Sequence, residues 1–457
     1  MMRMRHVLVV LCAHAPFLAC AEPKPEASAP PPDALPAEVA PILETTDDRP
    51  VAGLSDYGDD VTELARAQNR TEPPHPTRKG SSRRTRTHPR IDETKDGYVA
   101  VLPGANNVAT PAYHRGRIYT GGYGTYELHS INAETGESAW SLRLSDDGPT
   151  DPSCRDGICV FNTFSCTTFA VDAETGRELW SWYLGSPQLA TPVVAGNVVY
   201  ASYPDGTGPA DTGYAIAAMD LKTGKHLWRR YIDGEVNSTP VAHGDSVYLA
   251  TKVGTLYELA AKDGAVRNAR RNRIASPPVL ASSGILYGRA EQPAAADIIV
   301  AAETLFPHLE AAPAAREPIP QRPRPLVADS RLVTVDGETV VARDQKTGAK
   351  LWHKALPSDR AADISAPLLY AGGSVLLATQ SGSVLRLNAE TGAVEDGFSL
   401  GNPIASQPIA VGGWIYAGTH NGRVVAFDTG RPELTGWEML GGTADRQGAV
   451  KPDAEER

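Results

Sequence analysis

The sequence predicts an all-β protein in which eight four-stranded sheets close into a ring, an eight-bladed β-propeller. One observation is the pattern Asp/Asn-x-x-Thr-Gly-x-x-x-Trp, which occurs at residues 132–140, 172–180, 220–228 and 344–352. The other is a series of prolines that recur every 38 to 48 residues, at Pro111, Pro152, Pro192, Pro240, Pro278, Pro325, Pro367 and Pro408. A period of about 40 residues with four strands per unit is typical of propellers.

The strands of each unit are predicted from short runs of β-branched and aromatic residues bounded by Gly and Asn, such as 198–202, 246–250, 375–378 and 414–418. The repeated pattern lies at the turn before the last strand. There a glycine supplies a positive φ without steric cost, and the tryptophan offers a flat surface for packing against the next unit. These blade-docking positions are Gly136, Trp140, Gly176, Trp180, Gly224, Trp228, Gly348 and Trp352. Partial copies occur at 388–392, where Asp396 stands in the tryptophan position, and at 262–264 and 428–430.

Closure of the ring requires the two ends of the domain to share a blade, so the strand-like stretch 98–102 is expected to complete the last blade, or the reverse. Two units are irregular. The third has an insertion at Tyr203–Gly213, rich in Gly, Asp and Pro, and the fifth has one at Ala294–Pro325, rich in Ala and Pro. Each is either a tolerated insertion or a contact surface.

The four Thr-Gly…Trp turns and the unit length resemble the quinoprotein-like (pyrroloquinoline quinone repeat) eight-bladed β-propeller family, over about residues 98–442. This resemblance implies a ring of eight blades with tryptophan-docking turns, but no single activity, because the family includes dehydrogenases and assembly scaffolds. The chain is similar to the propeller lipoproteins of the outer-membrane barrel-assembly machinery, which implies a periplasmic scaffold that offers loops to a protein partner. It differs from them in its longer tether and in its two insertions.

The N-terminal residues predict export. Residues 1–19 are predicted to be a signal peptide, with Arg3 and Arg5 before a short apolar run. Ala19-Cys20 resembles the lipobox of bacterial lipoproteins, which implies Cys20 as the lipid attachment site. The alternatives are a secreted protein without an anchor and a start that is not an export signal. Residues 20–96 are predicted to be a disordered Pro-rich linker, 97–442 the propeller, and 443–457 a disordered tail. The basic run at 78–90 is either solvated linker or a contact with an anionic surface such as lipid headgroups.

Three cysteines lie in the body of the chain, at Cys154, Cys159 and Cys166. Asp156-Gly157 reads as a two-residue hairpin turn, which would place Cys154 opposite Cys159 as a directly opposed, non-hydrogen-bonded pair. A Cys154–Cys159 disulfide is therefore expected in an oxidising compartment, with a bridge from Cys166 or no bridge as the alternatives. The cysteine and histidine spacings do not match a zinc site, so no metal is expected.

The remaining sequence indicates binding rather than chemistry. A net charge of −10 argues against a nucleic-acid module resting on bulk positive charge. The family's dehydrogenases hold their quinone with an adjacent cysteine pair, which this chain lacks, so no cofactor and no enzyme activity are expected. His226 and His353 lie in or just after docking turns, where strand-surface positions are expected. The prediction is thus an outer-membrane-anchored lipoprotein scaffold; the alternatives are a quinone-dependent dehydrogenase or a propeller that binds a polysaccharide or polyanion in its central channel.

Overall fold

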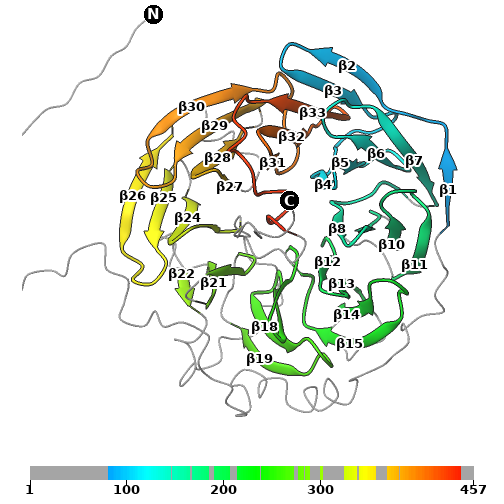
Figure 1. Cartoon of the computed structure of the whole chain (residues 1–457). Coiled ribbons are helices and arrows are strands. Elements are labelled where there is room, and N and C mark those ends of the chain that lie inside the picture. Colours follow the sequence, from blue (N-terminus) through cyan, green and yellow to red (C-terminus); the bar gives the residue numbers. More distant parts are fainter. Residues whose placement is uncertain are drawn as a thin grey trace, which may run out of the picture.

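The computed structural model of the protein describes residues 81–443, except 146, 165–166, 185–189, 206–213, 237, 272–275, 282–283, 289–298, 302–323, 337–338, 357–367 and 380. Within this range every helical or extended element is a β-strand, and the strands form eight sheets arranged as a ring (Figure 1). We number the sheets blades 1 to 8 in chain order of their innermost strands. The prediction of an all-β propeller is confirmed.

Five blades are antiparallel sheets of four strands that run in chain order from the centre of the ring to its rim. Blade 2 contains β8 (Ser153–Arg155), β9 (Ile158–Asn162), β10 (Thr167–Asp172) and β11 (Glu178–Tyr183), and blade 3 contains β12 (Val193–Ala195), β13 (Val198–Pro204), β14 (Tyr214–Asp220) and β15 (His226–Ile232). Blade 4 contains β16 (Val241–His243), β17 (Ser246–Ala250), β18 (Thr255–Ala260) and β19 (Val266–Arg271). Blade 6 contains β23 (Leu326–Ala328), β24 (Arg331–Asp336), β25 (Thr339–Asp344) and β26 (Lys350–Ala355), and blade 7 contains β27 (Leu369–Ala371), β28 (Ser374–Ala378), β29 (Ser383–Asn388) and β30 (Val394–Ser399).

Blade 5 has three strands among the described residues, so the prediction of eight four-stranded blades is not confirmed. Its described strands are β20 (Val279–Ala281), β21 (Gly284–Gly288) and β22 (Ile299–Ala301), so the described residues form seven blades of four or more strands and one sheet of three. The predicted insertion Ala294–Pro325 lies largely outside the described residues.

Blades 1 and 8 each gain a fifth strand from the N-terminal part of the chain. Blade 1 consists of β4 (Ala112–His114), β5 (Arg117–Thr120), β6 (Glu127–Asn132) and β7 (Ser138–Leu144), with β1 (Ser82–Thr85) paired to the outer edge of β7. Blade 8 consists of β31 (Ile409–Val411), β32 (Trp414–Gly418), β33 (Arg423–Asp428) and β3 (Gly97–Val101), with β2 (Arg90–Thr94) outermost. The N-terminal strand therefore completes the last blade, as expected.

The strands β1 and β2 also correct the predicted domain boundary. Residues 20–96 were expected to be linker throughout, but ordered pairing begins at Ser82, which lies opposite Leu144. Ser82 and Arg84 also reach the next blade, where they hydrogen-bond to Glu178 and to the carbonyl of Thr175. A short strand becomes stable here because β7 offers a ready edge of unpaired backbone groups. Residues 1–80, including the predicted signal peptide and Cys20, lie outside the described residues.

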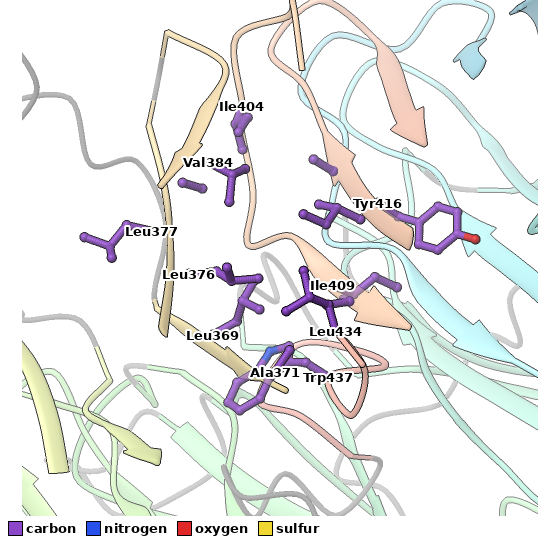
Figure 2. Close-up of a cluster of buried hydrophobic side chains, with 14 of the residues drawn as sticks. Leu369, Ala371, Leu376, Leu377, Val384, Ile404, Ile409, Tyr416, Leu434 and Trp437 are labelled. Atoms are coloured by element: carbon purple, nitrogen blue, oxygen red, sulfur yellow. The ribbon is translucent and has the colours of Figure 1, made fainter. Parts of the chain in front are cut away.

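The innermost strands lie side by side in the order β4, β8, β12, β16, β20, β23 and β27, and β31 lies next to β4. Seven of the eight marker prolines stand directly before an innermost strand, and the eighth, Pro367, is not described. The hydrophobic core lies between neighbouring blades, in clusters that each combine residues of two or more blades. Figure 2 shows one such cluster, formed by blades 7 and 8 and the segment after β33.

Candidate functional site

The connections between strands divide the ring into two faces, because neighbouring strands run antiparallel. In blade 1, the β4–β5 and β6–β7 turns lie on one face, which we call the turn face. The β5–β6 connection and the link from β7 to β8 lie on the opposite face, which we call the loop face. The third-blade insertion was predicted at Tyr203–Gly213, but Tyr203 and Pro204 belong to β13 and pair with β14. The connection therefore begins at Asp205, on the loop face, and its residues 206–213 are undescribed.

In blades 1, 2, 3 and 6 the repeated pattern places a tryptophan against the turn of the next blade. The indole Nε1 donates to a backbone carbonyl of that turn, 33 to 41 residues later in the sequence, at 2.8–3.1 Å, in the pairs Trp140–Ala173, Trp180–Leu221, Trp228–Ala261 and Trp352–Ala389. A glycine of that turn lies under each ring: a Cβ on Gly176, Gly224, Gly264 or Gly392 would come within 2.4–2.7 Å of indole atoms. Gly136 lies under Tyr98 instead of a tryptophan, and Gly348 follows the incompletely described blade 5.

This docking predicts different costs for two glycine substitutions. Gly224 and Gly196 both have positive φ, 68° and 55°, but a Cβ meets Trp180 at 2.6 Å in the first and nothing within 4 Å in the second. Both alanine variants should lose about 1–2 kcal/mol of unfolding free energy from the backbone conformation. Gly224→Ala should lose a further 1–3 kcal/mol, roughly, from overpacking. Equal midpoints of chemical denaturation for the two variants would contradict the docking role.

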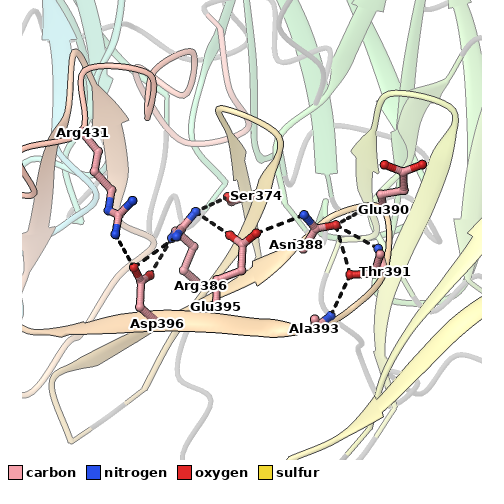
Figure 3. A network of polar contacts seen from close by, with 9 residues as sticks. All are labelled: Ser374, Arg386, Asn388, Glu390, Thr391, Ala393, Glu395, Asp396 and Arg431. Carbon is pink, nitrogen blue, oxygen red and sulfur yellow. Dashed lines mark hydrogen bonds and ion pairs between the residues drawn. The ribbon is translucent and has the colours of Figure 1, made fainter.

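The seam between blades 7 and 8 replaces the tryptophan by ion pairs (Figure 3). Asp396 occupies the tryptophan position and binds Arg386 of β29 at 2.6 Å and Arg431, which follows β33, at 2.5 Å. Glu395 binds Arg386 at 2.5 Å. The hydrogen bond from Arg386 holds the pKa of Asp396 below its ordinary value. At the tryptophan position this seam therefore has one ion pair between the blades, Asp396–Arg431, which salt screens, in addition to the apolar cluster of blades 7 and 8.

The seam between blades 8 and 1 uses tyrosines. The hydroxyl groups of Tyr98 and Tyr416 both donate to the carbonyl of Ala133 at 3.0 Å, and both rings are buried. Burial raises the pKa of each hydroxyl, so both remain protonated donors. In blade 8, buried tyrosines thus donate a hydrogen bond to a turn carbonyl of the next blade, as the tryptophans do in blades 1, 2, 3 and 6.

The segment after β33 turns from the rim toward the centre of the ring (Figure 1). Trp437 pairs with Ala410 of β31 through two backbone hydrogen bonds, and the next carbonyl, of Glu438, accepts from Tyr113 of β4. Leu434, Trp437 and Met439 are buried, and Figure 2 shows Leu434 and Trp437 with Leu369, Ala371 and Ile409. The segment therefore lies along the inner edges of blades 8 and 1.

Cys154 and Cys159 are joined by a disulfide in the β8–β9 hairpin, with a Cα–Cα distance of 4.0 Å. They are directly opposed in the register that the Asp156-Gly157 turn imposes, with Arg155 opposite Ile158. Both cysteines are buried against blade 1. Cys166 lies outside the described residues.

One buried ion pair lies at the base of the third-blade insertion. Asp205, which follows β13 and is the last described residue before the undescribed segment 206–213, accepts from Arg229 of β15 at 2.9 Å, and both side chains are fully buried. The Arg229 guanidinium also lies 4.8 Å from the centre of the Tyr231 ring. The pair therefore fixes where the insertion leaves blade 3.

Two histidines are buried in neutral form. Burial lowers the pKa of His129 to about 3 and that of His226 to about 4, with nearby His88 and Arg229 acting in the same direction. His226 is 2% exposed and meets Trp182 edge-on, so the expected strand-surface position was wrong; His353 is exposed, as expected. The ring of Trp182, which belongs to β11 of the preceding blade, packs against His226 and so helps to bury it. The register shift next to Met219 does not account for the difference, because blade 6 has the equivalent shift between Ala342 and Arg343.

These histidines predict a loss of stability in acid. The unfolded chain takes up protons near pH 6.5, whereas the folded chain resists protonation down to pH 3–4, so stability is present above pH 6.5 and falls as the pH decreases toward 4. Each histidine contributes a slope of up to about 1.4 kcal/mol per pH unit. His226→Phe keeps the ring against Trp182 and removes one titrating group, so denaturation series between pH 6.5 and 4.5 should show a shallower decline. An unchanged slope would show that His226 titrates normally in the folded protein.

The sequence analysis missed four threonines that shape the loop face. Each follows the second strand of its blade, is buried, and accepts through Oγ1 from the backbone N–H four residues later: Thr163, Thr251, Thr379 and Thr419. Three of them also form an isolated bridge with the link from the preceding blade. Their recurrence at one position of the repeat was the available signal.

The described residues lack a membrane-spanning helix and a metal-binding cluster of side chains. Among them there is no helix with the length and hydropathy needed to cross a membrane. Within the same residues no group of three or more His, Cys, Asp or Glu side chains is arranged to hold a metal ion.

The ring of repeats with tryptophan-docking turns defines a β-propeller of the pyrroloquinoline quinone-like repeat class. The family model described as outer membrane protein assembly factor BamB matches residues 92–208, 189–270 and 210–448, well over half of the chain. This chain belongs to that family. The outer membrane protein assembly factor BamB of Shewanella oneidensis is 28% identical over 98 residues, which cover 21% of this chain and 25% of that relative's length.

Solved structures with low sequence identity show the same fold. BamB from Moraxella catarrhalis has a TM-score of 0.50 and 17% identity, over 77% of this chain and 99% of that chain. The computationally designed Ika8 protein has a TM-score of 0.53 and 16% identity, over 72% and 98% of the two chains. Sqt1 of Saccharomyces cerevisiae has a TM-score of 0.55 and 10% identity, over 72% and 97%.

Proposed function

We propose that this protein is a non-catalytic scaffold of the cell envelope that binds a protein partner through its loop face and takes part in the assembly of outer-membrane proteins. The observation that carries the proposal is the match of residues 92–448 to a family described by an outer-membrane assembly factor. The loop face supports it, because the irregular third-blade insertion begins there on a base held by the Asp205–Arg229 pair. Binding loops on a rigid ring are a common way to present a partner site.

The test is deletion of the gene combined with site-specific photo-crosslinking in cells. A crosslinker at exposed Tyr126 on the loop face should capture an assembly component, whereas one at exposed Lys222 on the turn face should not. Deletion should lower the amounts of outer-membrane barrel proteins. The proposal is contradicted if deletion leaves the amounts of outer-membrane barrel proteins unchanged and the crosslinker at Tyr126 captures no assembly component.

We also propose that the chain is exported and anchored by acylation of Cys20, with the Pro-rich residues that follow acting as a tether. This proposal is supported by the order of the N-terminal residues, in which basic residues are followed by an apolar run and then by a small residue directly before Cys20. Several acyl chains together anchor a protein stably. Cys20→Ala should move the protein from the membrane fraction to the soluble fraction, and retention in the membrane fraction would contradict the anchor.

A complete fourth strand in blade 5, giving eight full blades, is part of the same proposal. It is supported by β20, which lies beside both β16 and β23 and so has its place in the ring. A crystal structure tests it directly. A ring that excludes β20–β22 would contradict it.

A further inference from the structure

A group of uncharged polar residues forms a continuous surface on the loop face, from the link between blades 7 and 8 to the β5–β6 connection of blade 1. All are exposed except Asn402, which is partly exposed. We call this surface the polar arc, and it consists of Asn402, Asn421, His420, Asn107, Asn106 and Tyr123.

Hydrogen bonds connect the arc from one end to the other. The Asn421 amide donates to Asn402 at 3.4 Å, and His420 Nδ1 lies 2.7 Å from Asn107 Oδ1. At the blade 1 end, the backbone of Tyr123 pairs with Asn106 and Asn107 at 2.8 and 2.9 Å. These contacts bring together residues more than 300 positions apart and hold them without charged groups.

The arc keeps hydrogen-bonding capacity toward solvent. Among the described residues, the Asn106 side-chain amide has no partner, and Asn107 uses its oxygen but not its Nδ2 group. Tyr123 is 48% exposed and is held edge-on by Phe164, with ring centres 5.7 Å apart. An exposed large aromatic ring that is fixed by a neighbour loses little further freedom on binding.

We propose that the polar arc binds a neutral oligosaccharide, an activity beyond the proposed scaffold function. Asparagine amides present both donors and acceptors, which match the hydroxyl and acetamido groups of sugars. A fixed tyrosine ring offers an apolar surface for the C–H face of a sugar ring and a polar hydroxyl at its edge. The lack of formal charge in the arc disfavours an anionic ligand, which would select lysine or arginine.

The test is calorimetric titration of the full chain with two neutral probes, chitohexaose and maltohexaose. Saturable binding of at least one probe is expected. Tyr123→Ala should weaken that binding about three- to tenfold, the effect of one lost aromatic contact. Tyr183→Ala, which removes an exposed tyrosine at the rim of blade 2, should leave the affinity unchanged.

A second variant keeps the test decisive if Tyr123→Ala lowers the thermal midpoint. Asn106→Ala removes an exposed amide that hydrogen-bonds to no other described side chain, and it should weaken binding severalfold with the midpoint unchanged. The proposal is overturned if neither probe binds saturably, or if the arc variants bind as well as the Tyr183→Ala control. Neither result bears on the scaffold function, because outer-membrane protein amounts after deletion test that separately.

Discussion

Trp228→Ala is expected to lower the free energy of unfolding by about 3–5 kcal/mol, the cost of emptying a large buried site. Trp228 is fully buried, packs beside Tyr200 with ring centres 5.8 Å apart, and lies over Gly264 of the next blade. Its indole also donates to the carbonyl of Ala261 at 2.8 Å, so the substitution leaves a partly buried carbonyl without its partner. The substitution therefore weakens the contact between blades 3 and 4 as well as the packing within blade 3.

The measurement is chemical denaturation followed by circular dichroism, with Leu227→Ala as the matched control. Leu227 precedes Trp228 on the same strand but is 40% exposed, so its substitution should cost well under half as much. A Trp228→Phe variant should recover part of the loss by refilling the site. Equal midpoints for Trp228→Ala and Leu227→Ala would show that the ring does not depend on its docked indoles.

Asp205→Ala is expected to cost about 3–5 kcal/mol because it leaves the Arg229 charge buried without its ion-pair partner. Both side chains are 0% exposed, so water cannot replace the lost carboxylate. The double variant Asp205→Ala/Arg229→Met should be more stable than Asp205→Ala alone, since it removes the uncompensated charge as well.

An exposed pair provides the control for this prediction. Asp245 binds Arg267 at 2.7 Å, but its side chain is 82% exposed, so Asp245→Ala should leave the thermal midpoint almost unchanged. If Asp205→Ala shifted the midpoint no more than Asp245→Ala, the pair at the base of the insertion would have no structural role. The third-blade loop would then need another anchor.

The parts of the fold that could be predicted are those in which the same residues recur at the same positions of each repeat. The Thr-Gly turns, the tryptophans and the marker prolines recur at fixed spacing, and each has a physical task within its own unit or the next. The prediction of a fourth strand in blade 5 is not confirmed by the described residues, which form three strands there. The prediction was wrong where a tertiary edge orders residues of a polar linker, as β7 orders β1. The burial of His226 was missed because the ring that packs against it, Trp182, comes from another blade.

From the amino-acid order alone follow the repeating unit, its docking turns and the closure of the last blade by the N-terminal strand, because these depend on residues close in sequence or on a strict period. The folded ring alone decided the ion-paired seam at Asp396, the placement of Trp437 along the inner strands and the polar arc. Each of these needs contacts between distant units, such as His420 with Asn107, and no local pattern encodes which loops the closed ring will bring together.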